Sequence, residues 1–500
     1  MSGCIIDYIC NGLFLYQMIA SLITYSLLYM VQFYKARHKR YQLFRYYGIP
    51  GPKQNILNGN YDIWGKLPYT LDMDENLRDR YGKIIGIFVG DIPSIVVADL
   101  KILEKVFIED TAIFKDRCDV LLKISGTMSI LFAPYKEWTL YRKIMSPPFR
   151  RYAMRGKTTH LIEETVKSIV DYIDARLEPN DSGKLATCID IQGLMKSAML
   201  KVISVIAIKL PDVQVGEHDE YVGHLETFLS YADSVLANSP VWMRGLARVL
   251  EGLLKIYEGR LLGQVKREID LAINDYAKRK SNDSSDQQNH IIDTLIRSHH
   301  EGRLSRSEVM NNALAILLAG YDTSSTALTY LFWVLAKHTD VQDKLRSDLI
   351  AHGIESQYMD QVIYESLRRY PTVRTFLTRV ASENVQYDNL MIPRGTIVLY
   401  NSWLLHFDPE IWPDPMRFDP DRFSPGKTRH PCAFAPFGFG ERRCIGYQLA
   451  MLEMKMIVCD IIIRYKIHLK TPTELEQCVS AKFLTRPRET VVIEFERSSQ

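Results

Sequence analysis

Apolar residues follow three patterns along this chain, and each pattern predicts a different kind of element. Between Asn11 and Tyr34 no residue is charged and most are apolar, a run long enough to cross a hydrocarbon core of roughly 30 Å. Two short β-branched runs, at 83–90 and 94–98, are separated by Gly and Pro and predict strands. From about Asp99 to Lys337 apolar residues recur at steps of three and four, which predicts helices. We therefore expect a mainly α body with small β-sheets, an α+β fold.

The charged residues beside the N-terminal apolar run predict its orientation. Only Asp7 is charged before the run, whereas Lys35 to Arg40 form a basic cluster directly after it. By the positive-inside rule the rest of the chain then stays in the cytosol. A cleaved signal peptide would place its basic residues before a shorter apolar run and a small-residue cleavage site after it, and neither feature occurs here. We expect residues 1–34 to form an uncleaved, single-pass transmembrane anchor, with a buried core helix as the alternative.

The segment after the basic cluster predicts a change of direction. Residues 48–52 read Gly-Ile-Pro-Gly-Pro, which favours a stiff turn. We expect residues 35–52 to be a basic and Pro/Gly hinge and residues 53–500 to form one large domain. The polar segment 280–289 predicts a loop between helices and not a domain boundary.

Composition and charge exclude several classes of protein. A net charge of +3 over 500 residues argues against a general nucleic-acid binder, whose affinity needs clustered Lys and Arg. The 8 cysteines form no CxxC pair and no disulfide-framework spacing, which argues against a zinc site or a secreted, disulfide-rich scaffold. The thiols are expected to face a reducing cytosol.

One cysteine lies in a setting that suits a metal ligand. The stretch 437–446 has the pattern F-G-x-G-x-R-x-C-x-G, in which Gly438 and Gly440 let the backbone turn tightly and approach a flat ligand. Because Gly446 leads into a helical pattern, the Cys444 sulfur is expected near a helix N-terminus, which favours the thiolate. A thiolate there can ligate haem iron and promote O–O cleavage. Isolated cysteines elsewhere are expected to be small buried hydrophobic residues: Cys188, Cys432 and Cys459.

A long apolar helix is predicted after the capping-box pattern 305–308, and it turns polar at 319–324, Ala-Gly-Tyr-Asp-Thr-Ser. One interpretation is structural: a mid-helix hydroxyl bonds back to a carbonyl one turn earlier and bends the helix, and Asp322 pairs with a cation. The other is chemical, because beside a haem thiolate a carboxylate and an alcohol placed by a helix distortion can relay the two protons that dioxygen cleavage requires. On the second interpretation Thr323 acts in oxygen activation and Asp322 in the proton relay.

Two further spacings place side chains one helical turn apart. Glu365 and Arg368 can bond to each other before Pro371 ends their helix, although an exposed pair of this kind contributes little. Trp138 and Arg142 share a helix face, and an indole N–H and a guanidinium suit the propionates of a haem. Taken alone, each of these patterns is weak.

Together these motifs resemble those of the cytochrome P-450 superfamily, and they occur in the family's order. Segment 437–446 resembles its haem-binding signature, 319–324 its A-G-x-D/E-T-T/S motif with Ser324 last, and 364–371 its E-x-x-R segment. The resemblance covers nearly the whole chain and is nearest to animal microsomal members that oxidise drugs and steroids. It implies a cytochrome P-450 fold with an N-terminal transmembrane helix, in which residues 53–500 are the haem-thiolate catalytic domain.

The resemblance also implies roles for the residues that match. Cys444 would be the axial ligand of the iron of haem b, with Phe437 in the same cofactor-binding loop. Contacts with the haem propionates are implied for Trp138, Arg142, Arg379, Arg442 and, more loosely, Arg117. Arg422, in the meander motif 418–423, would join the Glu365–Arg368 pair, and a carboxylate held by two guanidinium groups would lock the loop that presents Cys444.

The implied reaction inserts one atom of dioxygen into a lipophilic substrate such as a sterol, fatty acid or xenobiotic. The chain has no G-x-G-x-x-G fingerprint for a flavin or dinucleotide, so electrons are expected from NADPH through NADPH-cytochrome P-450 reductase, with cytochrome b5 as a second donor. The implied location is the endoplasmic reticulum membrane, with the catalytic domain in the cytosol. Basic residues on the cysteine side could steer an acidic reductase, or could simply be solvated: Lys136, Lys143, Arg443 and Lys455.

The substrate pocket is expected, by family analogy, to be mostly apolar. Its candidate lining residues are Val120 to Leu122, Ile316, Ala319, Val373 to Leu377 and Ala481 to Leu484. Segments 225–229 and 241–243 could dip into the membrane, and core packing explains them equally well.

The pattern departs from the family's in two places, and two other functions stay open. The connection from Lys344 to Glu365 is about ten residues shorter than is common, so an accessory helix is expected to be missing, and Thr339 stands where a proline is frequent. A reductase-independent haem-thiolate isomerase or dehydratase acting on a lipid peroxide is one alternative, which the intact Asp322–Thr323 pair disfavours. A non-catalytic haem sensor is the other.

Overall fold

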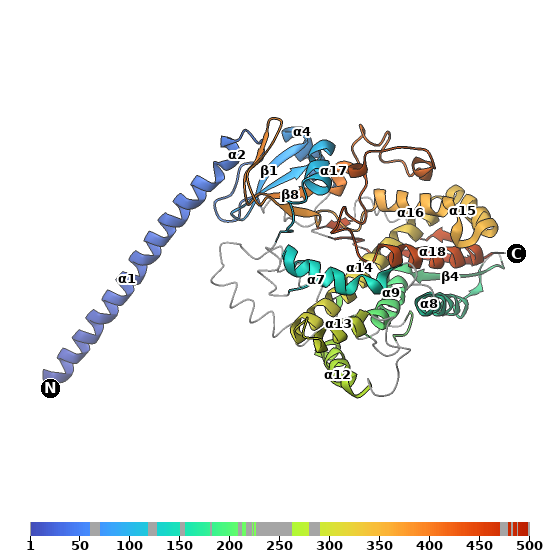
Figure 1. Ribbon diagram of the computed structural model, residues 1–500, viewed down its shortest axis with the longest axis horizontal. Coiled ribbons are helices and arrows are strands. Elements are labelled where there is room, and N and C mark those ends of the chain that lie inside the picture. The colour runs from blue at the N-terminus through green and yellow to red at the C-terminus, as the bar shows by residue number, and fades with distance from the viewer. Residues whose placement is uncertain are drawn as a thin grey trace.

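The computed structural model has a long N-terminal helix that projects from a largely helical body (Figure 1). The structure describes residues 2–60, 71–118, 128–150, 156–180, 183–208, 213–216, 223, 225–226, 263–279, 291–470, 479–481, 484–487 and 489–498. Its helices are α1 Ser2–Tyr41, α2 Leu43–Tyr46, α4 Leu71–Tyr81, α5 Leu100–Glu104, α7 Tyr135–Met145, α8 Lys157–Asp174, α9 Ile191–Ile208, α12 Gly263–Arg279, α13 Ile291–His300, α14 Arg306–Lys337, α15 Thr339–His352, α16 Gln357–Arg369, α17 Ser402–His406 and α18 Tyr447–Arg464. Its strands are β1 Ile84–Val89, β2 Ile92–Val97, β3 Glu178–Pro179, β4 Leu185–Asp190, β5 Thr378–Val380, β6 Val385–Tyr387, β7 Leu390–Ile392, β8 Ile397–Tyr400, β9 Tyr465–Leu469, β10 Val479–Ala481, β11 Thr485–Pro487 and β12 Val492–Arg497.

Helix α14 forms the axis of the main core. It begins with the predicted capping box, in which Ser305 and Glu308 satisfy each other's backbone N–H groups. Most of its side chains from Val309 to Ala336 are buried, because other helices cover it on several sides. Helix α9 packs closely along it at Gly320, where a Cβ atom would lie 2.7 Å from the side chain of Ile203. The helix runs unbroken through the polar segment 319–324, so the predicted distortion does not interrupt it.

A four-stranded sheet with the order β1-β2-β8-β5 packs beside this helical core. The runs at 83–90 and 94–98 form β1 and β2, as predicted. They pair antiparallel, with Ile85 opposite Val96, and β2 then pairs in parallel with β8. The sheet has its own hydrophobic core with helix α5 and Phe44 of α2.

A second sheet, β3-β4-β12-β9, joins the middle of the chain to its C-terminus. Strand β12 lies between β4 and β9 and is antiparallel to both. Strands β3 and β4 interrupt the region 99–337, where the periodicity predicted mostly helix. Because β4 is only six residues long, its alternation is too short to stand out in that region.

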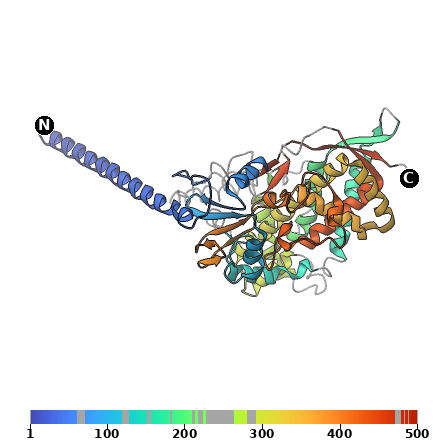
Figure 2. The same ribbon diagram turned by 90° about the horizontal axis from the view of Figure 1, so that it is seen from above.

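The apolar run and the basic cluster form one continuous helix, α1, which is docked on the first sheet (Figure 2). The Arg37 guanidinium is buried and donates to the carbonyl oxygens of Ile56 and Leu57, and the Tyr41 hydroxyl donates to that of Gly90 over 2.8 Å. The Pro/Gly segment lies along β1, with the Gly86 N–H bonded to Pro50 O at 2.7 Å. The part of the chain expected to be a hinge is therefore bonded to the domain.

Two further predictions concern connections and membrane spans. Helix α15 leads to α16 through only the short 3-10 turn Gly353–Glu355, so the described chain lacks an accessory helix there, as predicted. The predicted loop 280–289 lies outside the described residues. Of the described helices, α9 is long and apolar enough to cross a membrane, but 72% of it is buried inside the protein, which is typical of a core helix.

Candidate functional site

The loop 437–446 presents Cys444 at the start of helix α18. Gly438 and Gly440 adopt φ angles of +75° and +56°, a region that other residues rarely enter. A Cβ atom at Gly438 would also lie 2.9 Å from the side chain of Leu377. The Cys444 N–H bonds to Phe437 O at 2.8 Å, which closes the loop. Gly446 is the N-cap residue of α18, so the sulfur lies near a helix N-terminus as predicted.

The Cys444 thiol is surrounded by protein yet accessible. Burial raises the pKa of this thiol, although the Gly446 N–H donates to the sulfur and the guanidinium groups of Arg142, Arg117 and Arg443 favour the thiolate. The side chain nevertheless keeps exposed surface. The Cys444 sulfur is therefore available to a ligand.

Four guanidinium groups gather around this cysteine, each from a different segment of the chain. The Arg142 guanidinium of α7 donates to Arg443 O over 2.9 Å, and that of Arg117 donates to Arg442 O over 3.1 Å. Arg442 lies over the Trp138 ring at 4.7 Å. Arg379 is buried and close enough to repel Arg117. All five predicted propionate contacts are therefore brought together: Arg117, Trp138, Arg142, Arg379 and Arg442.

This cluster carries more positive charge than the protein itself neutralises. Burial lowers the pKa of Arg117 to about 9, with repulsion from Arg379 and Arg442 adding to the effect, and lowers that of Arg379 and of Arg442 to about 10. Among the described residues, one carboxylate forms an ion pair with the cluster, Asp116 at 3.7 Å from Arg442. The Nε atoms of Arg117 and Arg442 are buried without a hydrogen-bond partner. A ligand with two carboxylates, such as haem b, fits this donor set.

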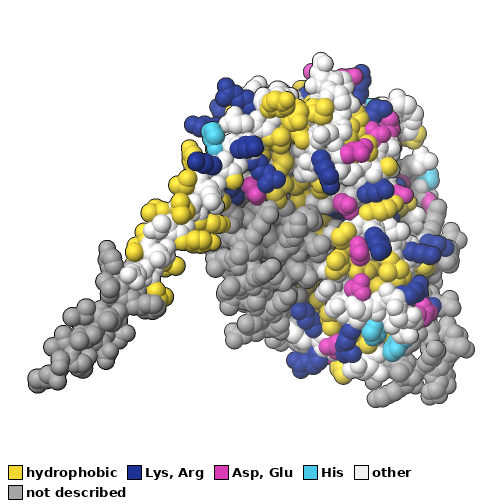
Figure 3. All heavy atoms as spheres, turned by 60° about the vertical axis from the view of Figure 1, so that its left-hand side comes forward, with side chains coloured by type: hydrophobic (Ala, Val, Ile, Leu, Met, Phe, Trp, Pro, Cys, Tyr) yellow, Lys and Arg dark blue, Asp and Glu magenta, His cyan; other side chains and the backbone are white. Residues whose placement is uncertain are grey.

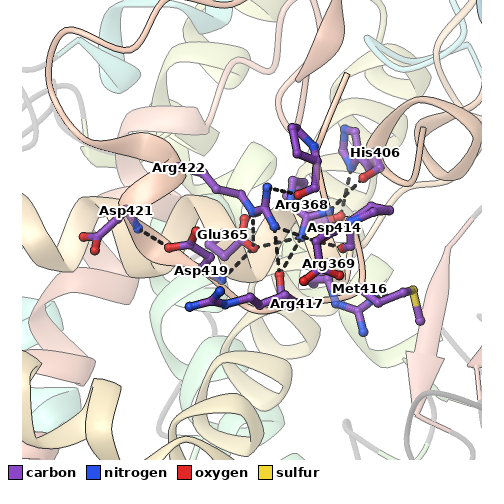
Figure 4. A network of polar contacts seen from close by, with 12 residues as sticks. Glu365, Arg368, Arg369, His406, Asp414, Met416, Arg417, Asp419, Asp421 and Arg422 are labelled. Atoms are coloured by element: carbon purple, nitrogen blue, oxygen red, sulfur yellow. Dashed lines mark hydrogen bonds and ion pairs between the residues drawn. The ribbon is translucent and has the colours of Figure 1, made fainter. Parts of the chain in front are cut away.

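Glu365 lies at the centre of a buried network (Figure 4). Arg368 binds both of its carboxylate oxygens, at 2.7 and 2.8 Å, and neither side chain of this pair is exposed to solvent. Arg422 lies 3.4 Å from the same carboxylate, and the Asp419 N–H donates to it over 3.0 Å. The predicted association of these three side chains is confirmed, and the third contact is looser than the first.

Arg368 and Arg422 carry the network into the segment before the cysteine loop. The Arg368 guanidinium donates to the carbonyl oxygens of His406 and Pro415, and that of Arg422 donates to those of Pro413 and Asp414 over 2.6 Å. These two guanidinium groups thus satisfy the carbonyl of the last residue of α17 and three carbonyls of the loop that follows it.

Three successive residues of α14 bind three different partners. The Arg486 guanidinium of β11 donates to Oδ2 of Asp322 over 2.8 Å. The Thr323 hydroxyl donates to Ala319 O over 2.7 Å, the back-bonding that the sequence predicted. Ser324 shares a hydrogen bond with Glu453 of α18. Asp322 and Thr323 are therefore adjacent, but each side chain is bonded elsewhere.

The predicted pocket residues are only partly described. Val373 and Leu484 form an isolated antiparallel bridge, which brings two of the candidate segments together. Ile316 is buried and Ala319 is partly exposed, as is Thr323 one turn later. The loop 120–122, residues 482–483 and segments 227–229 and 241–243 lie outside the described residues, and so does the side chain of Ala481.

The basic residues predicted on the cysteine side differ in their surroundings. Lys136, Lys143 and Arg443 are exposed. Lys455 is instead half-buried and paired with Asp360 at 2.9 Å, so its charge is already balanced within the protein.

Two residues of the site were missed from the sequence. Glu453 is buried, and burial raises the pKa of its carboxyl to about 8. Its spacing from Leu449 and Ile457 places it on the buried face of α18, a signal that could have identified it. Arg486 pairs with a residue 164 positions away, and nothing in the local sequence indicates that contact.

Comparison with known proteins agrees with this geometry. The family model described as Cytochrome P450 matches residues 49–494. Cytochrome P450 3A31 of Mesocricetus auratus is 26% identical over 492 residues, covering 93% of this chain and 94% of the relative. Cytochrome P450 3A29 of Sus scrofa is 27% identical over 482 residues, covering 90% and 92%. Cytochrome P450 3A30 of Fundulus heteroclitus is 27% identical over 476 residues, covering 90% and 93%.

Proposed function

Because the chain belongs to the cytochrome P450 family and is therefore a haem-b monooxygenase, we propose that it inserts one atom of dioxygen into a lipophilic substrate. A sterol, a fatty acid or a xenobiotic would suit the apolar candidate lining residues. The observation that carries the proposal is the accessible Cys444 sulfur at a helix N-terminus, beside a guanidinium cluster that suits two carboxylates.

The residues of the chain would have separate tasks. When bound, haem b supplies the iron at which dioxygen is reduced and cleaved. Cys444 would ligate that iron, and Trp138, Arg142 and the other guanidinium groups would hold the propionates. Phe437 would support the loop, since its carbonyl accepts the Cys444 N–H. The network of Glu365, Arg368 and Arg422 would stay structural, since it binds loop carbonyls.

Proton delivery would depend on helix α14. We assign oxygen activation to Thr323, whose side chain is partly exposed in a largely buried helix. Asp322 would pass protons toward it, and its present bond to Arg486 must open for its carboxylate to turn to Thr323. A serine or threonine hydroxyl can both donate and accept, which suits a relay.

The electrons would come from NADPH through a separate flavoprotein reductase, with cytochrome b5 as a second donor. The exposed residues Lys136, Lys143 and Arg443 would attract an acidic partner surface. Helix α1 would anchor the protein in the endoplasmic reticulum membrane with the domain in the cytosol. Its described part exposes apolar side chains along its length (Figure 3), from Met18 to Tyr34.

The test is the difference spectrum of the reduced, carbon-monoxide-bound protein in membranes. We expect a strongly red-shifted Soret band, which reports cysteinate ligation. Cys444→Ala should lose this band while the protein stays folded, whereas Cys188→Ala should keep it. Cys188 lies on β4 and is exposed, so the prediction that it is buried was wrong. A band of a histidine-ligated haem in the unmodified protein, or survival of the shifted band in Cys444→Ala, would refute the ligand assignment.

A second measurement separates the monooxygenase from an isomerase of lipid peroxides. The membrane protein is supplied with NADPH and a purified flavoprotein reductase, and a panel of sterols, fatty acids and xenobiotics is screened for oxygenated products. A monooxygenase needs NADPH and dioxygen for every product formed. Turnover of a lipid hydroperoxide without either would instead identify the isomerase.

A further inference from the structure

The ion pair between Asp322 and Arg486 links the centre of the molecule to its C-terminal hairpin. Asp322 is 3% exposed in the middle of α14, and the Arg486 guanidinium donates to its Oδ2 over 2.8 Å. Breaking a pair of this kind by removing one partner leaves a buried, uncompensated charge. The contact is therefore a strong constraint on where the Asp322 carboxylate can point.

Strand β11, which carries Arg486, is tied to the segment that follows helix α16. The Thr485 N–H bonds to Thr372 O at 3.0 Å, and the Thr485 hydroxyl donates to Pro371 O. The next residue back, Leu484, is bridged to Val373. The backbone of this strand thus moves with the segment 371–373.

Leu484 and Arg486 lie two positions apart in an extended segment. Successive side chains of an extended chain point to opposite sides, so these two share one side while Thr485 points to the other. Leu484 and Val373 belong to the segments that we expect to line the substrate pocket. A displacement of Leu484 by a bound molecule would therefore be passed through one short strand to Arg486.

We propose that Arg486 is a positioning residue for the proton relay, which couples occupancy of the substrate pocket to the orientation of Asp322. The inference rests on the proposed function, because it takes Asp322 as the relay acid. With the hairpin in the observed place, Arg486 holds Asp322 away from Thr323, whose hydroxyl is bonded to Ala319 O. A molecule that displaces β11 loosens this hold and lets the carboxylate turn to Thr323.

The coupling is expected to determine whether the electrons of NADPH lead to oxygenated product or to hydrogen peroxide. In productive turnover, dioxygen, NADPH, one proton and the substrate R–H give R–OH, water and NADP⁺. When protons reach oxygen without insertion, dioxygen, NADPH and one proton give hydrogen peroxide and NADP⁺. A relay that is wrongly positioned therefore raises the peroxide formed per NADPH.

The test compares Arg486→Gln, Arg486→Lys and a matched control, Arg497→Gln. Arg497 lies in β12, the next strand along the chain, and also pairs with an aspartate, Asp174 at the end of α8, at 3.1 Å. We expect the glutamine at 486 to raise peroxide per NADPH by about tenfold, since positioned acid–base groups contribute at least that much. It should also change the solvent hydrogen isotope effect on NADPH consumption. The lysine should restore much of both, and Arg497→Gln should change neither.

A second readout does not depend on turnover. Backbone hydrogen exchange of α14 is measured with and without 4-phenylimidazole, which binds an accessible haem iron and fills the adjoining space. We expect the probe to change exchange around Asp322 in the unmodified protein and in Arg497→Gln, but not in Arg486→Gln. An unchanged response in Arg486→Gln, in protein that keeps its carbon-monoxide band, would overturn the inference. If the unmodified protein showed no such band, that result would instead refute the proposed function.

Discussion

Single residues show where this protein depends on a bound group. Arg117, like Cys444, keeps some exposed surface although burial lowers the pKa of its guanidinium to about 9. Burial of several like charges is unfavourable unless an anion joins them. The fold therefore positions cations that an anionic ligand can balance, and the residues around Cys444 favour ligand binding more than they favour stability of the ligand-free protein.

Glu453 allows a prediction about pH. Burial raises the pKa of its carboxyl from 4.5 to about 8, so between these values the folded protein keeps a proton that the unfolded chain has lost. Folding stability is therefore expected to fall as pH rises through this window and to level off above it. The contribution of this group is on the order of 5 kcal/mol at most.

Glu453→Gln should remove this pH dependence, because an amide keeps an acceptor for Ser324 and does not ionise. The difference in urea midpoint between the variant and the unmodified protein is measured at pH 5 and pH 8. We expect the variant to gain relative stability at the higher pH. Glu355→Gln, at an exposed carboxylate, should leave the difference constant. Parallel pH profiles for Glu453→Gln would contradict the prediction.

At the scale of elements, helix α14 combines close packing with chemistry. Gly320 lets α9 approach closely, because no side chain lies between the two helices at this position. The next three residues are Tyr321, Asp322 and Thr323. An unbroken helix fixes the directions of these side chains relative to each other, because successive residues of a helix are related by a constant rotation. The packing of α9 thus positions the polar segment.

Gly320→Ala should destabilise the protein by about 1–3 kcal/mol, the usual cost of overpacking. The added Cβ would lie 2.7 Å from Cδ1 and Cγ1 of Ile203, and one of these must move. Adding Ile203→Val should recover part of the loss, because it removes Cδ1. The thermal midpoints of the single and double variants are the measurement, and equal losses for the two would show that Ile203 is not the cause.

The network at Glu365 stabilises an irregular segment that has no helix or strand of its own. Glu365→Gln should cost about 3–5 kcal/mol, because it leaves Arg368 buried without its charged partner. We expect little carbon-monoxide-reactive haem protein from this variant. Asp360→Asn, on the same helix but in a half-exposed pair with Lys455, should cost less than about 1 kcal/mol. Normal haem content in Glu365→Gln would argue against a structural role.

At the scale of the whole molecule, helix α1 and the domain form one connected structure. Helix α1 continues past the basic cluster, and its face with Phe33, Arg37 and Tyr41 is turned to the first sheet. Lys35, Lys39 and Arg40 remain exposed on the same turns. A docked helix fixes the direction of α1 relative to the domain, which a flexible hinge would leave open.

Arg37→Ala should loosen this connection without changing the haem site. Spin labels on α1 at Gln32 and on the surface of the domain at Glu410 would report the distance distribution between the two parts in lipid nanodiscs. We expect a broader distribution in Arg37→Ala than in the unmodified protein, and an unchanged one in Lys39→Ala, which removes an exposed charge of the same helix. A broad distribution already present in the unmodified protein would show that α1 is not docked.

Features that depend on neighbouring residues could be predicted from the sequence alone. Strands β1 and β2, the capping box of α14, the glycine conformations around Cys444 and the Glu365–Arg368 pair all depend on neighbours within a few residues. The family motifs added the cysteine ligand and the residues suited to the propionates, because their order along the chain is specific. These predictions needed no knowledge of packing.

Contacts between distant groups could be identified only in the folded structure. The pairing of Asp322 with Arg486, the burial of Glu453 against Ser324 and the docking of Arg37 on the first sheet join residues far apart in the chain or on separate elements. Such contacts depend on how helices and sheets pack, and local periodicity carries no information about that packing. The same limit explains why β3 and β4 were missed, since they are stabilised by pairing with each other and with the C-terminal strand β12.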